Sequence, residues 1–148
     1  MQRQSPLNLM AVITASLNLQ TRGQTDIHDI TRPLAELLAK SQLSNGILTV
    51  FCPSSTSAVT TLEYEPGCVS DLRRLFEELV PSNRPYDHDD TWGDANGYSH
   101  ARAALLKASL TIPFVQGRLT LGTWQQIIYV DFDNRPRRRE LVVQIMGE

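Results

Sequence analysis

The chain is poor in cysteine and has no excess of either charge, and each shortage excludes a class of protein. Only two of the 148 residues are cysteine, Cys52 and Cys68, and they form no metal-binding or redox motif. This excludes a disulfide-rich fold and favours two reduced thiols in a cytoplasmic protein, with a disulfide between them as the alternative. The 14 basic and 16 acidic residues leave a net charge of −2. That balance gives no sign of a surface for nucleic acid or for a membrane.

Long apolar runs are also absent from the sequence. No stretch approaches the roughly 20 apolar residues that a membrane-spanning helix needs. Residues 1–8 lack the order of charged, apolar and cleavable segments that marks a signal peptide. Hydrophobic residues make up 41% of the chain and charged residues 20%, which is ordinary for a globular protein and excludes global disorder. Residues 1–148 are therefore expected to form one cytoplasmic domain.

The spacing of apolar residues predicts both strands and helices. Alternating or continuous apolar residues predict strands over residues 7–20, 47–52, 58–64, 109–115, 123–132 and 139–146. Spacing of three and four predicts helices over residues 31–43, with Thr31 as N-cap, and over 68–80 and 99–108. Runs of strands with two to three inserted helices indicate a single compact α+β domain with a mixed or antiparallel β-sheet core.

The segment richest in side chains that can bind metal or transfer protons runs from Asp87 to His100. Its 14 residues include four aspartates, two histidines, an asparagine and two glycines, and no aliphatic residue larger than alanine. Such a segment cannot form core, so we expect a polar loop that forms one wall of an active site. Carboxylates and imidazoles make His88, Asp94 and His100 candidate ligands for Mg²⁺ or another divalent metal. The alternative is a solvated acidic loop whose histidines make ordinary hydrogen bonds.

Further candidates in and near this segment concern ligand binding. Asn96 and Ser99 are candidate ligand-binding residues, although Asn96 could equally form a turn through its own backbone. His100 is expected near the start of a helix, where unpaired backbone donors favour an anion that the imidazole could share. Gly93 and Gly97 are expected to adopt positive φ values.

Polar residues elsewhere could hold or activate a ligand. Ser55 and Thr56 follow a predicted strand and could cradle a phosphate, or form a simple polar turn. Glu63 is a candidate catalytic acid whose burial the alternation leaves open. Arg137 and Arg138 belong to the only basic cluster and could bind phosphate, or keep a hairpin turn exposed to water.

An aromatic residue and an amide open one of the later predicted strands. Trp124 is expected to anchor the core by packing, and the neighbouring Gln125 either pairs with backbone or contacts a ligand.

Four blocks of sequence resemble one family. They run Ser55-Thr56-Ser57-Ala58-Val59-Thr60-Thr61-Leu62-Glu63-Tyr64-Glu65-Pro66-Gly67, then Gly93-Asp94-Ala95-Asn96-Gly97-Tyr98-Ser99-His100, then Ser109 to Gln125 with the run Leu121-Gly122-Thr123-Trp124-Gln125, and then Asp133-Asn134-Arg135-Pro136-Arg137-Arg138-Arg139. In this order and over most of the chain they are similar to the YjbQ-like family. Two positions depart from the family pattern, because Ser54 and Tyr98 stand where histidine is usual.

The resemblance implies a compact α+β fold, a homotrimer and a secondary thiamine-phosphate synthase activity. That activity joins a hydroxymethylpyrimidine diphosphate to a thiazole phosphate and releases diphosphate. It makes His100, together with Glu63, the candidate catalytic residues and a small phosphorylated metabolite the expected partner. The departure at Tyr98 leaves a non-catalytic trimer that binds a phosphometabolite or a metal as the alternative. Metal-assisted hydrolysis is a third possibility.

Overall fold

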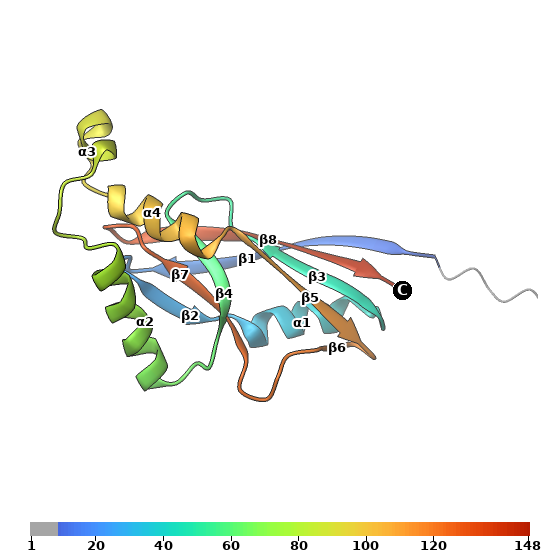
Figure 1. Ribbon diagram of the computed structural model, residues 1–148. Coiled ribbons are helices and arrows are strands. Elements are labelled where there is room, and N and C mark those ends of the chain that lie inside the picture. The colour runs from blue at the N-terminus through green and yellow to red at the C-terminus, as the bar shows by residue number, and fades with distance from the viewer. Residues whose placement is uncertain (1–8) are drawn as a thin grey trace, which may run out of the picture.

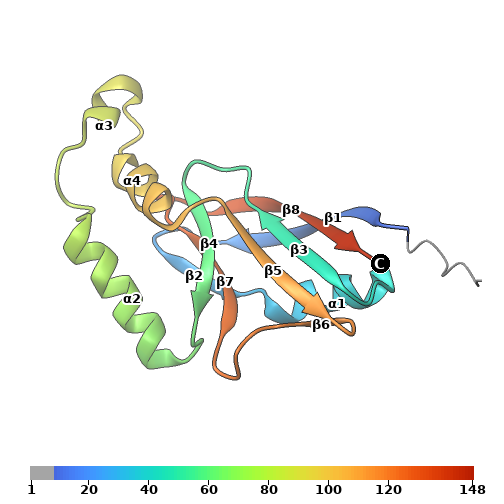
Figure 2. The same ribbon diagram turned by 45° about the vertical axis from the view of Figure 1, so that its right-hand side comes forward.

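Two antiparallel sheets form the frame of a single α+β domain, and the computed structural model describes residues 9–148 of it (Figures 1 and 2). The larger sheet has the order β1 (Ala11–Thr21), β8 (Arg137–Gly147), β3 (Gly46–Phe51), β5 (Ser109–Val115) and β6 (Arg118–Leu119). The smaller has the order β2 (Asp26–Asp29), β7 (Gln126–Asp131) and β4 (Ser57–Leu62). The helices are α1 (Thr31–Ser41), α2 (Pro66–Leu79), α3 (Asp87–Trp92) and α4 (Gly97–Leu106).

The core lies between the two sheets and extends beneath the helices. Alternation along β8 buries Leu141, Val143 and Ile145 and turns their neighbours outward. Leu34 and Leu38 of α1 pack into the same cluster. A second cluster lies under α2 and α4, which both views place at the end of the molecule away from the C-terminus.

The outward face of the larger sheet carries apolar side chains that no helix within residues 9–148 covers. Val12, Met146 and Ile47 form one row across β1, β8 and β3, and Val142 and Phe51 form a second row. Each of these five side chains is between 38% and 56% exposed. The polar row of Thr14, Gln144 and Thr49 lies between these two apolar rows. We call this surface the open sheet face, and exposed apolar surface is typical of interaction sites.

The structure confirms the α+β prediction but adds elements that the periodicity missed. Residues 9–148 contain four helices instead of two to three, and they include the unpredicted β2, β6 and α3. None of the residues of α3 is buried, so the helix has no apolar stripe for the pattern to detect. Its first turn carries Asp87, Asp89 and Asp90, which the positive end of the helix dipole stabilises.

Three local expectations need correction or lie outside the described residues. Thr31 is the first residue of α1 and not its N-cap: Asp29 Oδ1 accepts from the Thr31 backbone N–H at 2.9 Å, and the Thr31 hydroxyl accepts from Ile127 N–H at 2.8 Å. Trp124 lies before the start of β7 and is 72% exposed, so it does not pack into the core as expected. The signal-peptide inference and the predicted strand start at Leu7 fall on residues 1–8, outside the described part.

Two further findings concern membrane spans and the cysteines. No helix within residues 9–148 is long and apolar enough to cross a membrane. Cys52 and Cys68 are free thiols, the first buried in the core and the second partly exposed at the start of α2.

Candidate functional site

A cavity of about 470 Å³ lies where the β3–β4 turn, α3, the start of α4 and the β7–β8 turn meet. We call it the His100 cavity. Its polar lining comes from three segments: Ser54, Ser55 and Thr56; His88, Asp94, Asn96 and His100; and Asp133, Arg137 and Arg139. Trp92 of α3, 75% exposed, stands at its edge. Because segments distant in the sequence converge here, the cavity is the candidate site of chemistry.

Two histidines share this cavity. The ring centroids of His88 and His100 lie 4.2 Å apart, and His88 Nε2 is 3.6 Å from Asp94 Oδ1. Burial, followed by the nearby His88, lowers the pKa of His100 below its ordinary value of 6.5, although Asp94 opposes the shift. His100 is therefore a neutral imidazole at neutral pH, with one nitrogen able to donate and the other able to accept.

Asn96 connects α3 to the β7–β8 turn. Its side chain is buried, and in one amide orientation Nδ2 donates to Asp133 Oδ1 at 3.3 Å. Rotating the amide places the nitrogen 3.0 Å from Asp94 Oδ1 and 3.2 Å from His88 Nε2. The first orientation therefore ties Asn96 to the β7–β8 turn, and the second ties it to His88 and Asp94.

A buried ion pair forms the floor of the cavity. Arg139 donates from Nε to Asp131 Oδ2 at 2.7 Å and from Nη2 to Asp131 Oδ1 at 2.9 Å. The same guanidinium donates to Ser54 Oγ at 3.0 Å and to Thr56 Oγ1 at 2.9 Å. Thr21 Oγ1 donates to Asp131 Oδ2 at 2.6 Å. Since these bonds occupy its donors, Arg139 holds the β3–β4 turn in place and has little capacity for a ligand.

Arg137 is the cation of the cavity that retains free donors. Its Nε donates to Asp133 Oδ2 at 2.6 Å, and its other nitrogens make no hydrogen bond within residues 9–148. Burial raises the pKa of Asp133, but hydrogen bonds from Arg137, the Asn134 backbone and Asn96 outweigh this and lower that pKa below 3.8. Asp133 is thus a carboxylate at neutral pH that orients Arg137 towards an anion.

The structure brings together most, but not all, of the predicted site residues. Those that line the His100 cavity are Ser55, Thr56, His88, Asp94, Asn96, His100 and Arg137. Ser99 is fully buried, and its Oγ donates to the Phe132 carbonyl at 2.5 Å, so it anchors α4 to β7. Arg138 is exposed on the opposite face of β8 from Arg137. Ser99 and Arg138 therefore do not line the cavity.

Glu63 and Gln125 lie together at the other end of β4. The strand ends at Leu62, Glu63 is exposed, and Gln125 Nε2 donates to Thr61 Oγ1 at 3.2 Å. At about 3.3 Å per residue, Glu63 lies roughly 20 Å along the strand from the β3–β4 turn. Glu63 therefore does not line the cavity that contains His100, because the two residues flank opposite ends of the smaller sheet.

The sequence reasoning missed Asp131, Asp133 and Arg139 as site residues. Arg137 and Arg139 share one face of β8, and alternation would have grouped them if the predicted strand had begun two residues earlier.

The prediction of a polar loop from Asp87 to His100 is also wrong, because this segment contains α3 and the first turn of α4. Gly93 has the expected positive φ of 68°. Gly97 is helical instead, and is required because a Cβ there would collide with the Tyr86 side chain.

The candidate metal ligands line one cavity without forming a complete ligand set. Within residues 9–148, no group of three or more histidine, cysteine, aspartate or glutamate side chains is arranged to hold a metal ion. Any cation bound here would need ligands from a substrate or from water in addition to Asp94 or His88.

Comparison with known proteins places the chain in a family. The sequence matches the family described as "UPF0047 protein YjbQ-like" over residues 15–148. A UPF0047 protein from Methanothermobacter thermautotrophicus is 39% identical over 139 residues, which cover 94% of this chain and 95% of the relative. The crystal structure of a YbjQ-like protein of unknown function from Sulfolobus solfataricus has a TM-score of 0.90 and 31% identity, covering 95% of this chain and 100% of that one. A hypothetical protein from Aeropyrum pernix has a TM-score of 0.86 and 33% identity, covering 92% and 99%. The chain therefore belongs to the UPF0047 YjbQ-like family.

Proposed function

We propose that the His100 cavity binds the diphosphate group of a small metabolite and that the protein is a thiamine-phosphate synthase-like transferase. The observation that carries this proposal is the combination of a neutral imidazole, His100, with a guanidinium that retains free donors, Arg137, in one cavity. Arginine is well suited to planar, bidentate recognition of phosphate oxygens.

In the proposed reaction, the negative charge that develops on the departing diphosphate needs the most stabilisation. The carbon–oxygen bond of the pyrimidine diphosphate breaks, and its electron pair leaves with the diphosphate. The lone pair of the thiazole nitrogen then forms the new carbon–nitrogen bond, and the product carries a positive thiazolium. Arg137, the hydroxyl of Ser55 and an N–H of His100 are the donors that would stabilise the developing negative charge. The exposed ring of Trp92 at the edge of the cavity offers a flat surface for the pyrimidine.

A divalent cation is compatible with this arrangement. Mg²⁺ is usually held by one or two carboxylates together with substrate phosphates and water. Asp94, whose side chain is 46% exposed at the cavity, is the carboxylate that would contribute. The bound ion would neutralise charge on the diphosphate, and the transfer is therefore expected to need Mg²⁺.

Arg137→Met is the variant that tests the phosphate-binding role. The purified protein is mixed with the pyrimidine diphosphate and the thiazole phosphate, with and without Mg²⁺, and thiamine phosphate is measured by mass spectrometry. Loss of a charged hydrogen-bond donor costs about 1.5–3 kcal/mol, so we expect KM for the diphosphate to rise by about 10- to 100-fold. Arg138→Met removes the same charge from the outward face of β8 and should leave KM at the parent value.

Two results would contradict this prediction. A parental KM in Arg137→Met would remove Arg137 from the site. A folded parent protein that gives no product, yet is stabilised thermally by the pyrimidine diphosphate, would support the binding role without turnover.

The tyrosine at position 98 is no argument for binding without turnover. The Tyr98 side chain lines a different cavity from His88 and His100, so it does not replace a group of the His100 cavity.

The protein is further proposed to assemble as a homotrimer through the open sheet face. Five exposed apolar side chains, in two rows on either side of the polar row Thr14, Gln144 and Thr49, give a surface that water solvates poorly and that a second copy would cover. Closed symmetric assemblies are the usual way in which a repeated interface of this kind is satisfied.

Met146→Lys is the variant that tests the assembly. Met146 lies between Val12 and Ile47, so a lysine there places a charge at the centre of the proposed contact. We expect the mass measured by light scattering after gel filtration to fall from trimer to monomer, while far-ultraviolet circular dichroism stays unchanged. Leu105→Lys alters a 60% exposed leucine on α4, away from this face, and should remain trimeric. A monomeric parent, or a trimeric Met146→Lys variant, would contradict the proposal.

A further inference from the structure

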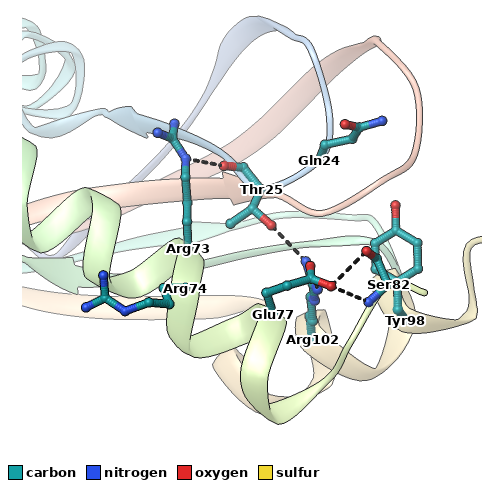
Figure 3. A pocket seen from close by; sticks show the side chains of 8 residues that line it. All are labelled: Gln24, Thr25, Arg73, Arg74, Glu77, Ser82, Tyr98 and Arg102. Carbon is teal, nitrogen blue, oxygen red and sulfur yellow. Dashed lines mark hydrogen bonds and ion pairs between the residues drawn. The ribbon is translucent and has the colours of Figure 1, made fainter. Parts of the chain in front are cut away.

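A second cavity, of about 560 Å³, lies on the side of α4 away from the His100 cavity. Figure 3 shows the side chains that line it. It is formed by the β1–β2 turn, by one face of α2 with the segment that follows it, and by α4. Its lining residues are Gln24 and Thr25, Arg73, Arg74, Glu77 and Ser82, and Tyr98 and Arg102. We call it the Arg102 cavity. It shares no lining residue with the His100 cavity.

Arg102 forms a buried floor for this cavity and makes four hydrogen bonds. Its guanidinium is 3% exposed and donates to the Val80 carbonyl at 2.7 and 3.0 Å. It also donates to Thr25 Oγ1 at 3.0 Å and to Glu77 Oε2 at 2.6 Å. The Tyr98 ring packs against the guanidinium, with 4.9 Å between Cζ and the ring centroid. The cavity is therefore a preorganised polar site and not a gap between flexible surface side chains.

The only negatively charged acceptor among the lining residues is already hydrogen-bonded, whereas several donors are free. Glu77, the one carboxylate of the lining, accepts from Arg102 and from both the backbone N–H and the hydroxyl of Ser82. Arg73 uses only Nε, which donates to the Thr25 carbonyl at 3.1 Å. Within residues 9–148, the Tyr98 hydroxyl makes no hydrogen bond, and in Figure 3 the Tyr98 and Gln24 side chains carry no dashed interaction. A lining with a free guanidinium and neutral donors, whose one carboxylate is already bonded, fits a ligand that is rich in negatively charged oxygen.

The turn that carries Thr25 holds a strained backbone. Gln24 and Thr25 have φ values of 55° and 61°, which are uncommon for residues other than glycine and costly for a β-branched one. The turn is fixed at the cavity by Arg73 and Arg102, and on its other side Gln24 N–H donates to the Asp133 carbonyl at 2.6 Å. Strain of this kind persists where surrounding contacts over-determine the backbone, and it clusters at ligand-binding sites.

We propose that the Arg102 cavity is a second binding site, for a small metabolite that carries a phosphate or a carboxylate group. Its oxyanion accepts from the free nitrogens of Arg73, from the Tyr98 hydroxyl and from the Gln24 amide. The site is independent of the proposed transferase function, because α4 separates the two cavities. Tyr98 and His100 are two residues apart on this helix, so at about 100° per residue their side chains point to opposite sides.

Residue-resolved nuclear magnetic resonance distinguishes this site from the His100 cavity. Two arms titrate the whole protein with inorganic phosphate and with malonate, and TROSY spectra follow the backbone amides and the arginine Nε–H signals. We expect saturable shifts at Gln24, Thr25 and Tyr98 and at the Arg73 Nε–H, with millimolar affinity. The arm with the tighter binding identifies the oxyanion as phosphate or carboxylate.

Variants assign the shifts to the cavity. Arg73→Met should abolish them, and Tyr98→Phe, which keeps the ring over Arg102, should weaken binding by about 2- to 10-fold. Arg32→Met removes an arginine that is 89% exposed on α1, and Arg137→Met alters only the His100 cavity, so both should leave the shifts intact.

Three outcomes would overturn the proposal. The first is no saturable shift at these residues in either arm. The second is shifts confined to the lining of the His100 cavity and lost in Arg137→Met. The third is an affinity that neither Arg73→Met nor Tyr98→Phe changes; if Arg73→Met fails to fold, Tyr98→Phe decides alone.

Discussion

Replacing His100 by alanine is expected to lower the kcat for thiamine phosphate formation by about 10²- to 10³-fold, the usual cost of losing one donor to a developing oxyanion. The imidazole lines the His100 cavity beside His88 and is neutral at neutral pH, so its N–H can donate to the departing diphosphate. It makes no hydrogen bond to other residues of the described chain, so the free energy of unfolding at neutral pH should change by no more than about 1 kcal/mol.

A matched histidine provides the control. His28 is likewise partly exposed, but it bonds Asp26 at 2.8 Å and lies outside both cavities. His28→Ala should keep the parental kcat for the transfer, measured in the same mass-spectrometric assay. Equal activity in His100→Ala and parent would exclude His100 from the reaction.

The pH dependence of His100 follows from the direction of its pKa shift. Because the pKa of His100 in the folded protein lies below 6.5, the imidazole stays neutral between pH 6.5 and that lowered pKa, and activity that needs the neutral form should persist over this range. Below pH 6.5 the unfolded chain binds more protons at this position than the folded one, so stability falls as the pH is lowered through the folded pKa. In His100→Ala this loss should be absent from urea unfolding curves recorded across that range.

Replacing Arg139 by methionine is expected to reduce the free energy of unfolding by about 3–5 kcal/mol, the cost of leaving a buried charge without its partner. Asp131 is completely buried and accepts two bonds from this guanidinium. The substitution also releases Ser54 and Thr56, so the β3–β4 turn loses its attachment to β8. Urea unfolding followed by circular dichroism measures the loss.

A double-mutant comparison separates the buried charge from lost packing. Asp131→Asn removes the carboxylate charge, so Arg139→Met with Asp131→Asn should be more stable than Arg139→Met alone. Arg138→Met, on the outward face of the same strand, should change stability by no more than about 0.5 kcal/mol. A loss below 1 kcal/mol in Arg139→Met would mean that water or another group replaces the guanidinium beside Asp131.

The sequence predicted the strands well and the grouping of the site less well. Residues 109–115 form β5 as predicted, because alternation is strong there and Ser109 and Val115 bound a clear apolar pattern. The site depends instead on which strands are neighbours. The order β2-β7-β4 brings the β3–β4 turn against the end of β7, where Phe132 N–H donates to the Thr56 carbonyl at 2.9 Å.

Periodicity could not assign each polar residue to an end of the smaller sheet. Glu63 and Thr56 both flank β4, and their residue types alone suit either end. Only the pairing of β4 with β7 places Thr56 beside Asp133 and Glu63 beside Gln125. Similarly, α3 has no buried residue, so it gave no helical period from which His88 could be positioned.

The alternation along β8 has an evolutionary consequence. This one strand presents Arg137 and Arg139 to the cavity, Leu141, Val143 and Ile145 to the core, and Val142 and Met146 to the open sheet face. Inserting or deleting a single residue within it would exchange the two faces along the remaining strand. The arginines of the cavity, the core residues and the open sheet face would then all be lost in one step. Lineages should therefore accumulate length changes in the β6–β7 connection around Trp124, and conserve the residue count of β8.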